Sequence, residues 1–346
     1  MARPLATVAF VPREVFSTTR RSLETLYART TAPFELVCVD GGSPPDLRDY
    51  LEHQSREKQF TLIRTDDYLT PNQARNLALE HVHTPYVVFV DNDVMVSPHW
   101  LAPLVRCAEE TGAWVVGPLY FEFLPEGRRL HMFGGQCHIA VNNENERVYH
   151  EHHRHAHTLR TDVSEPFVRQ ETELIEFHTV LVNMRAFDEL GPLDEGLLCN
   201  AEHGDLCMTV RNAGHTVFLE PASEITYVPP PRLEKMDAPF FLLRWSEAWS
   251  AANQSYFAKK WDLSPNNTRA KISTQWVSEH RRYRLLWLNQ LRKWIGRKWT
   301  RSFEKRLIAP IESAMNRHKY HPLEYGCAPK VNVHLVYQPH DVAAAA

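Results

Sequence analysis

Short apolar runs alternate with segments of helical periodicity along the first third of the chain. Residues 17–29, for example, place Leu23, Leu26 and Tyr27 on one face of a helix. An order of strand, helix, strand, helix predicts an α/β fold with a doubly wound, mostly parallel sheet. The predicted strands are residues 6–11, 34–39, 60–64, 86–90 and 113–117, and the predicted helices are residues 17–29, 45–54, 71–81 and 98–111.

The alternation ends after Pro118. Residues 119–175 are polar and rich in histidine, and they predict irregular structure. Three consecutive prolines, Pro229 to Pro231, form a rigid break, and the chain beyond them predicts helix from residue 239 to about residue 317. The elements expected between are a strand at residues 174–182, a helix at 202–213 and short strands at 216–219 and 224–227.

The strand expected at residues 86–90 is followed directly by Asp91-Asn92-Asp93. Five apolar residues in a row are typical of a strand buried on both faces. Asp91 and Asp93 are two positions apart, so they point to one side if the extended geometry continues. Open α/β sheets bind ligands at this carboxyl edge, and two carboxylates there could hold a divalent cation and through it a diphosphate. The alternative is that these acids only cap the helix that Ser97-Pro98 opens.

Two further groups follow predicted strands or open helices. Asp40, with two glycines after it, could accept bonds from a nucleobase or a ribose, or it could simply cap a glycine-rich turn. Arg75, in the segment Asn72 to Asn76, could offer its planar fork to a phosphate or a base, or it could be a solvated surface side chain.

A third group opens the helix expected at residues 202–213. Glu202 and Asp205 are spaced i, i+3 on one helix face, and an acid there could take a proton from a hydroxyl. His203 between them could act as a base or as a metal ligand. A charged helix N-terminus, favoured by the helix dipole, is the alternative.

Charge is distributed unevenly along the chain. The net charge of −3 hides a segment, residues 281–306, with ten basic residues and one acid, so the rest of the chain sums to −12. This asymmetry suggests an anionic partner for the C-terminal part. The six cysteines form no C-x-x-C pair, which favours buried free thiols. With no signal peptide and no membrane-spanning run, we expect a cytoplasmic protein.

Taken together, these pieces resemble family 2 glycosyltransferases of the GT-A fold. The resemblance implies a GT-A domain at residues 1–230, with a nucleotide-sugar-binding half (1–118) and an acceptor half (119–230), and a helical C-terminal extension at 231–346. The stretches that carry it are residues 8–12, 36–43, 74–79, 87–94, 181–195 and 202–221.

The resemblance also implies roles for the residues at these positions. Asp40 would contact the nucleotide base, with Pro12, Arg75 and Asn76 close to the nucleotide. Asp91 and Asn92 would bind the nucleotide-sugar, and Asp91 and Asp93 would bind Mn²⁺ or Mg²⁺ together with the diphosphate.

This chain departs from the family pattern in two places. The family usually has E-D-x-D-L, with the second acid as general base, whereas this chain has Glu202-His203-Gly204-Asp205-Leu206. Glu202, His203 or Asp205 could therefore be the catalytic base. Members of the fold often place a metal-binding histidine after the last core strand, but residues 225–229 contain none, so His203 could be the missing metal ligand.

The implied activity is metal-assisted transfer of a sugar, with inversion, from a nucleotide-diphosphate sugar, with a UDP-sugar favoured, to a hydroxyl of a glycan, a lipid-linked acceptor or a small molecule. The alternative is a catalytically degenerate GT-A-like protein that binds a nucleotide-sugar or scaffolds a partner. A nucleotidyltransferase is disfavoured because residues 11–15 are not glycine-rich.

Two histidine features have weaker interpretations. The tract from His150 to His157 has no spacing of a closed zinc site, and we interpret it as a solvated loop near the acceptor. His178, on a predicted strand, is interpreted as a core histidine with satisfied hydrogen bonds.

The basic segment 281–306 also carries an apolar stripe. Leu288, Leu291, Ile295 and Trp299 follow helical spacing, and arginine and lysine fill the other face. We expect this stripe to pack on the catalytic domain, with peripheral contact to an anionic membrane as the alternative. No nucleic-acid recognition module accompanies the charge, so a nucleic-acid partner is not expected.

Overall fold

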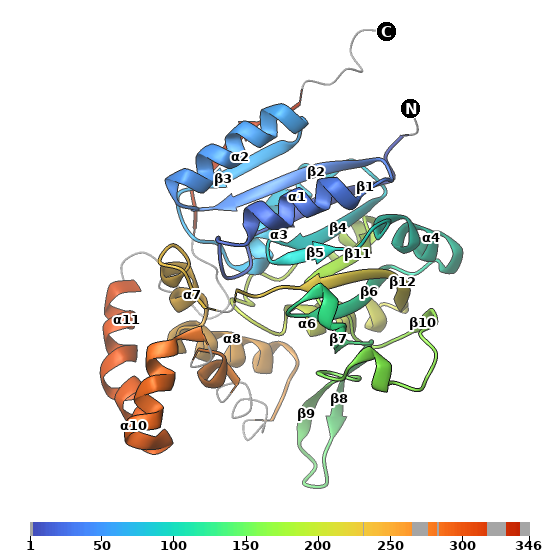
Figure 1. Cartoon of the computed structure of the whole chain (residues 1–346). Coiled ribbons are helices and arrows are strands. Elements are labelled where there is room, and N and C mark those ends of the chain that lie inside the picture. The colour runs from blue at the N-terminus through green and yellow to red at the C-terminus, as the bar shows by residue number, and fades with distance from the viewer. Residues whose placement is uncertain (1–2, 231, 265–275, 282–283, 317–329, 340–346) are drawn as a thin grey trace.

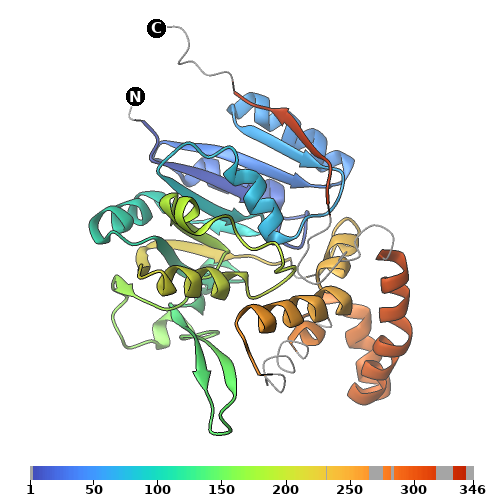
Figure 2. The same ribbon diagram turned by 180° about the vertical axis from the view of Figure 1, so that it is seen from behind.

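A computed structural model describes residues 3–230, 232–264, 276–281, 284–316 and 330–339. One large sheet runs through the molecule, helices cover both of its faces, and the C-terminal helices gather along one side (Figures 1 and 2). The α/β class expected from the sequence is confirmed.

Four parallel strands form the N-terminal half of this sheet. They are β1 (Ala6–Val11), β2 (Phe34–Gly41), β3 (Thr61–Thr65) and β4 (Tyr86–Asp91), and the helices are α1 (Thr19–Arg29), α2 (Pro45–Lys58), α3 (Pro71–Leu79) and α4 (Leu101–Thr111). The strands pair in the order β3-β2-β1-β4. Because helices cover both faces, almost every residue of β1 and β4 is buried, which explains their continuous apolar runs.

The second half of the sheet is mostly antiparallel. Its strands are β5 (Val94–Val96), β6 (Val115–Glu122), β7 (Arg129–Met132), β10 (Gln170–Glu171), β11 (Thr179–Asn183) and β12 (Val217–Tyr227). β11 lies between β4 and β6 and is antiparallel to both. β12 is one strand with a register shift between Glu220 and Glu224, where the sequence predicted two.

The expectation of irregular structure at residues 119–175 is wrong for much of this range. β8 (Gly135–Val141) and β9 (Arg147–His153) form a separate antiparallel hairpin. The solvated loop expected at residues 150–157 is therefore the end of a strand as far as His153. Two short 3₁₀ turns, η1 (Pro125–Gly127) and η2 (Arg160–Asp162), flank the hairpin.

The described part of the C-terminal region is mostly helical, with one strand. Two helices precede this region, α5 (Arg185–Leu190) and α6 (Glu202–Asn212). Its own helices are α7 (Ala238–Arg244), α8 (Glu247–Lys260), α10 (Leu286–Phe303), the π-helical turn η3 (Glu304–Ile308) and α11 (Ala309–Asn316). The exception is β13 (Val333–Tyr337), which pairs antiparallel with β3 at the edge of the sheet (Figure 2). The sheet order is therefore β10-β12-β6-β11-β4-β1-β2-β3-β13, with β5 on β12 and β7 on β6. Residues 265–275, 282–283 and 317 of the predicted helical stretch lie outside the described residues.

The apolar stripe of α10 packs only at its start. Leu288 is buried, but Ile295 is 41% and Trp299 70% exposed. Gly296, with φ of +80°, interrupts the helix between them. The expectation that the whole stripe packs on the catalytic domain is therefore wrong for its second half. No helix among the described residues is both long enough and apolar enough to cross a membrane.

A buried carboxylate ties the C-terminal region to the loop after β1. Asp237, which is fully buried, accepts hydrogen bonds from the backbone N–H of Phe16 (2.7 Å) and of Ser17 (2.9 Å) with Oδ1. Its Oδ2 accepts from the Ser17 hydroxyl (2.7 Å) and from the Glu234 N–H (3.1 Å). The Asp237 side chain thus accepts four hydrogen bonds and holds the start of α7 against the loop after β1.

Asp237→Ala is expected to lower the free energy of unfolding by about 3 kcal/mol, because it leaves buried donors without a partner. Ser17→Ala, which removes one donor of the same cluster, is the matched control and should cost no more than about 1.5 kcal/mol. Urea unfolding of both variants checks this, and equal losses in the two would contradict the role of Asp237.

Candidate functional site

The carboxyl ends of β1, β2 and β4 meet at one edge of the sheet and bring the predicted residues there. Val11 of β1 pairs in register with Asp91 of β4, so Pro12 and Asn92 follow side by side. β11 enters this edge from the opposite direction, and the Asp91 N–H donates to the His178 carbonyl (3.1 Å). The parallel strands therefore position the carboxylates, and the antiparallel strand adds a histidine.

Arg13 lies across both carboxylates of the D-x-D motif. Its Nε is 3.4 Å from Asp91 Oδ2, and its Nη1 is 3.6 Å from Asp93 Oδ2. The same Nη1 is 3.5 Å from Glu14 Oε2 and donates to the Tyr227 hydroxyl (2.9 Å). The guanidinium thus supplies positive charge to three buried carboxylates at once.

Asp91, Asp93 and His178 form a group that fits a divalent cation. One ligand atom from each lies within 4.8 Å of the others. Both carboxylate oxygens of Asp93 and Nδ1 of His178 are buried and make no hydrogen bond with the described residues. Buried polar atoms nearly always have a hydrogen-bond partner, so these three atoms could hold a cation between them. Two carboxylates and one imidazole suit Mn²⁺ better than Mg²⁺.

The electrostatics of the two aspartates differ. Burial raises the pKa of Asp93 to about 7, with Arg13 opposing this rise and the charge of Asp91 adding to it. Burial also acts on Asp91, but His178 and Arg75 outweigh it and hold the pKa of Asp91 below its usual value. Burial and the charge of Arg13 lower the pKa of His178 to about 4. His178 is therefore neutral at pH 7 and has a lone pair to offer a metal.

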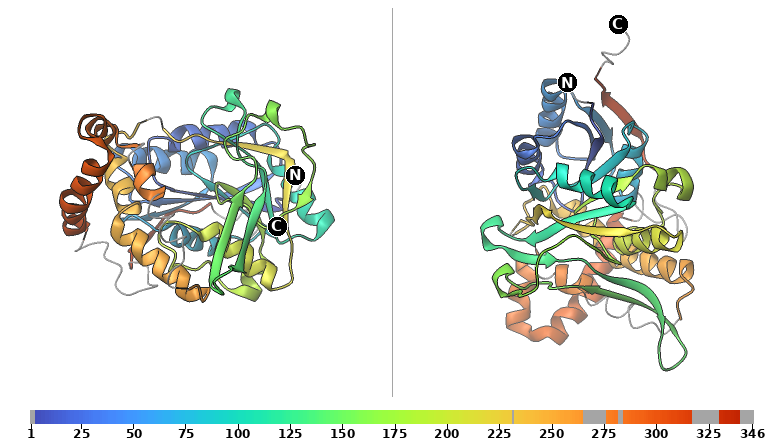
Figure 3. Two further views of the ribbon diagram at one scale, coloured as in Figure 1. Left: turned by 90° about the horizontal axis from the view of Figure 1, so that it is seen from below. Right: turned by 90° about the vertical axis from the view of Figure 1, so that its right-hand side faces the viewer.

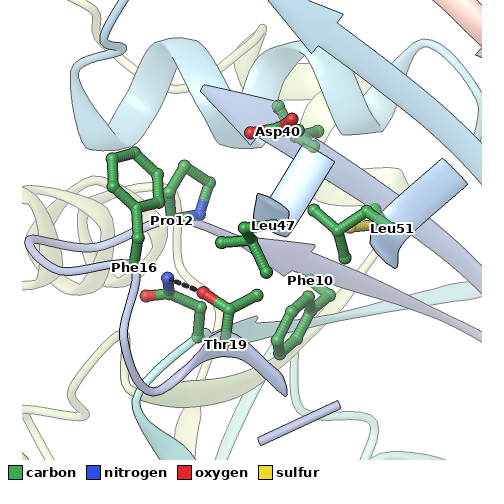
Figure 4. A pocket seen from close by; sticks show the side chains of 10 residues that line it. Phe10, Pro12, Phe16, Thr19, Asp40, Leu47 and Leu51 are labelled. Atoms are coloured by element: carbon green, nitrogen blue, oxygen red, sulfur yellow. Dashed lines mark hydrogen bonds between the residues drawn. The ribbon is translucent and has the colours of Figure 1, made fainter. Parts of the chain in front are cut away.

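Pro12, Asp40 and Asn92 line one small pocket at this edge (Figure 4). Its floor is apolar and comes from β1, the loop after it and α2. Asp40 accepts hydrogen bonds from the Ser43 N–H and hydroxyl, both at 2.9 Å, and pairs with Arg64. The structure thus brings together three of the residues expected to bind the nucleotide-sugar.

Asn92 also organises the loop after β1. Its side chain accepts from the Arg13 N–H (3.0 Å) and donates to the Val15 carbonyl (2.6 Å) and to the Thr19 hydroxyl (2.8 Å). These bonds hold Arg13 over the aspartates.

Arg75 and Asn76, both on α3, face different partners. Arg75 is buried and donates to Asp91 Oδ1 (3.2 Å), and its guanidinium stacks on the ring of Phe177 at 3.8 Å. It is therefore not a solvated surface side chain. Asn76 donates to the Leu193 carbonyl (2.8 Å) and to Glu195 (2.9 Å), and so fixes the segment before α6.

The three candidate bases at the start of α6 point in different directions. Glu202 is buried, with Oε1 3.4 Å from Arg244 Nη2. Asp205 accepts from Lys260 (2.8 Å) and from the Trp261 indole (2.9 Å), which occupies both of its oxygens. His203 lies between Glu176 and Glu151, and these carboxylates raise its pKa to about 10 against the opposing effect of burial.

His203 therefore does not join the group formed by Asp91 and Asp93. Its nearest acidic partners are Glu176 and Glu151, at 3.4 and 3.5 Å. His178, interpreted from the sequence as a core histidine, occupies the place next to the aspartates instead.

Two residues of this site were not expected from the sequence, Arg13 and Tyr227. Arg13 directly follows the end of β1, and that position is the signal that could have identified it. Tyr227, whose ring stacks on that of His178 at 4.2 Å, gives no local signal, because the contact depends on how β12 and β11 are placed.

Asp93→Asn is expected to stabilise the metal-free protein at pH 8. The folded-state pKa of Asp93 is raised from 3.8 to about 7, so protonated Asp93 stabilises the fold at low pH, and this contribution is lost as pH rises through 7. Asparagine cannot ionise, so the variant avoids this loss. We expect its free energy of unfolding to exceed that of the wild type by on the order of 2 kcal/mol at pH 8 and to be close to the wild-type value at pH 4. Urea unfolding in EDTA at both pH values measures it.

Asp91→Asn is the matched control for this prediction. Its carboxylate has a lowered pKa, so its stabilising contribution is present at high pH and lost as pH falls. The control variant should be less stable than the wild type at pH 8. A destabilised Asp93→Asn protein at that pH would show that the charge of Asp93 is well compensated by Arg13.

Part of this chain is similar to a known protein family and to one curated protein. The model of glycosyl transferase family 2 matches residues 13–166. The succinoglycan biosynthesis protein ExoM of Rhizobium meliloti (strain 1021) is 28% identical over 131 residues, which cover 37% of this chain and 42% of that protein.

One solved structure agrees with this chain at the level of the fold. The structure of GalNAc-T7 with UDP, GalNAc and Mn²⁺ has a TM-score of 0.51 at 15% identity, covering 92% of this chain and 58% of the other. S. aureus TarS has a TM-score of 0.45 at 15% identity, covering 69% and 38%. The chain thus spans less than two thirds of the length of each of these proteins. The resemblance inferred from the sequence is confirmed: residues 13–166 match family 2 of the glycosyltransferases, on a GT-A fold with a helical C-terminal region.

Proposed function

We propose that this protein transfers a sugar from a nucleotide-diphosphate sugar to an acceptor hydroxyl, with inversion at the anomeric carbon. The observation that carries the proposal is the group formed by Asp91, Asp93 and His178, at the sheet edge that also holds the Pro12–Asp40–Asn92 pocket. A UDP-sugar is the favoured donor. The acceptor is a hydroxyl of a glycan, a lipid-linked molecule or a small molecule.

A divalent cation, Mn²⁺ before Mg²⁺, would be held by Asp91, Asp93 and His178 and would neutralise charge on the diphosphate leaving group. Arg13 supports this function from the protein side. Its guanidinium already lies at the carboxylates and is 14% exposed, so it can pair with phosphate oxygens of the donor. Arg75 keeps Asp91 in place and its carboxylate ionised.

We assign the general base to Glu202 among the three candidates on α6. The oxygens of Asp205 are occupied by Lys260 and Trp261. The ring nitrogens of His203 lie 3.5 and 3.4 Å from Glu151 and Glu176, so its side chain is directed to those glutamates and not to Asp91 and Asp93. Glu202 would take the proton of the acceptor hydroxyl as that oxygen attacks the anomeric carbon from the face opposite the leaving diphosphate. One displacement of this kind inverts the configuration.

Asp93→Ala is expected to abolish the Mn²⁺-dependent part of UDP binding, because it removes two unpartnered ligand oxygens. Calorimetric titration of UDP with and without Mn²⁺ measures this. Asp188→Ala, an exposed aspartate on α5, is the control and should bind as the wild type does. The same metal-dependent affinity in Asp93→Ala and wild type would remove this residue from the site.

Glu202→Gln separates binding from catalysis. It should retain UDP binding and lose sugar transfer by at least about 100-fold, as expected for a general base. A wild-type protein that binds nucleotide-sugar but transfers no sugar to any acceptor or to water would favour the degenerate, non-enzymatic alternative. The reason to consider that alternative is that His203 stands where the family usually has an acid.

We also propose that the outer face of α10 contacts an anionic membrane surface. Trp294 and Trp299 are 86% and 70% exposed, among lysines and arginines of the same helix. α10 and α11 lie at the margin of the molecule, where this face is open (Figure 1). Exposed tryptophans flanked by basic residues suit the headgroup region of a bilayer that carries anionic lipids.

The double variant Trp294→Ala, Trp299→Ala is expected to bind phosphatidylserine-containing vesicles at least about 10-fold more weakly than the wild type. Co-sedimentation with such vesicles, and with neutral phosphatidylcholine vesicles, measures it. Val141→Ala, which removes a 62% exposed apolar side chain from the β8–β9 hairpin, is the control. Equal binding of wild type and double variant would exclude this face as the contact.

A further inference from the structure

The histidine-rich tract begins in β9, where strand alternation directs its residues 150–153 to opposite sides. Glu151 and His153 lie on the same side of the strand as buried Tyr149, whereas His150 and His152 are exposed on the other side. The hairpin, green in Figure 3, runs along the lower part of the molecule, and β8 contacts α6. Two residues of the tract, Glu151 and His153, therefore face the protein interior.

Five side chains from four parts of the fold converge on this inner face. They are His131 of β7, Glu151 and His153 of β9, Glu176 just before β11, and His203 at the start of α6. One ligand atom each of His131, His153 and Glu176 lies within 4.8 Å of the others, and the same holds for Glu151, His153 and His203. Because the two sets share His153, they form one continuous cluster.

Distances within the cluster are short. His153 Nε2 is 3.3 Å from Glu151 Oε1 and 3.6 Å from Glu176 Oε1. His203 Nδ1 is 3.4 Å from Glu176 Oε2. An ion placed among these atoms would need only small side-chain movements.

Three nitrogen atoms in the cluster have no hydrogen bond. The Nε2 atoms of His131, His153 and His203 are buried and make none with the described residues, although glutamate oxygens lie nearby. Buried polar atoms rarely remain unsatisfied in folded proteins. Three such imidazole nitrogens in one place are the donor set of a metal ion.

A carboxylate outside the cluster orients one of these histidines. His131 Nδ1 is 3.4 Å from Glu122 Oε2, and Glu122 is itself buried. When Nδ1–H donates to a carboxylate, the lone pair is left on Nε2, on the side of Glu176. This arrangement of carboxylate, histidine and metal is the usual support of a histidine ligand.

We propose that His131, His153, His203, Glu151 and Glu176 hold a transition-metal ion, with Zn²⁺ fitting best, at a site separate from Asp91, Asp93 and His178. Imidazole nitrogens with carboxylate oxygens suit Zn²⁺, whereas two aspartates and one histidine suit Mn²⁺. The rings of His131 and His178 are 5.0 Å apart, so the two sites are neighbours. The inference does not rest on the proposed function, because it concerns binding of the ion alone.

The test is titration of the untagged, full-length, metal-free protein with Zn²⁺ against a chromogenic chelator. The Asp93→Asn protein is titrated in the same way, because it lacks the first site. We expect it to bind one Zn²⁺, and we expect His153→Ala to weaken zinc affinity by at least about 100-fold, since His153 belongs to both ligand sets. Co²⁺ in place of Zn²⁺ gives visible absorption bands that should also be lost in His153→Ala.

His152→Ala is the matched control. His152 is the preceding residue of the same strand, but its side chain is exposed on the opposite side, so zinc affinity should not change. If circular dichroism shows that His153→Ala does not fold, His203→Gln replaces it with the same expectation. No zinc binding by Asp93→Asn, or equal zinc affinity in the Asp93→Asn protein with and without His153→Ala, would overturn the proposal and leave a cluster of ion pairs with protonated histidines.

Discussion

The carboxylates buried at the carboxyl edge of the sheet are tolerated only because arginine side chains lie within ion-pair distance of them. Burying an unpaired carboxylate costs several kcal/mol, and Asp91, Asp93 and Glu14 lie close together. Arg13 reaches all three, and Arg75 adds a second charge at Asp91. Even so, the compensation is incomplete at Asp93, whose pKa stays raised. A site of this kind attracts a further positive charge, which the proposed divalent cation would supply.

Residues of the C-terminal region also contact these buried charged groups. Glu14, which pairs with Arg13, accepts from the Trp245 indole (2.8 Å) and lies 3.2 Å from His280 Nε2. Arg244 donates to the Arg13 carbonyl (2.7 Å) and contacts Glu202. The expected boundary at residue 230 therefore separates two segments that share the electrostatics of one site. A fragment cut at that boundary would lose partners of Glu14 and Glu202.

The basic segment at residues 281–306 divides in a related way. Arg281 and Arg284 are buried, and Arg281 donates to the Trp245 carbonyl (2.9 Å). Among the described residues of this segment, the later arginines and lysines, on α10 and η3, are exposed, apart from the half-buried Arg292. Net charge along the sequence could not distinguish these two uses, because the same residue type neutralises buried groups in one place and covers a surface in another.

The sequence predicted those parts of the fold and the site that depend on local pattern. Continuous apolar runs identified β1 and β4, and the position of Asp91 after such a run located the edge of the sheet. The antiparallel insertion of β11 could not be predicted, because pairing between distant strands leaves no local periodicity. His178 acquires its place beside the aspartates through that pairing, and so a histidine on an apolar strand looked like a core residue. The β8–β9 hairpin was missed for a different reason: its polar, histidine-rich strands lack the apolar alternation that marks a half-buried strand.

β13 has a consequence for how the chain reaches this structure. Residues 333–337 cover the outer edge of β3, a strand that ends almost 270 residues earlier in the chain. During synthesis that edge, with its row of free N–H and C=O groups, must stay open until residues 333–337 have left the ribosome. Open edges of this kind pair readily with other chains. The nascent protein is therefore exposed to misassociation until β13 is available, and closing so long a loop is expected to be a slow step in its folding.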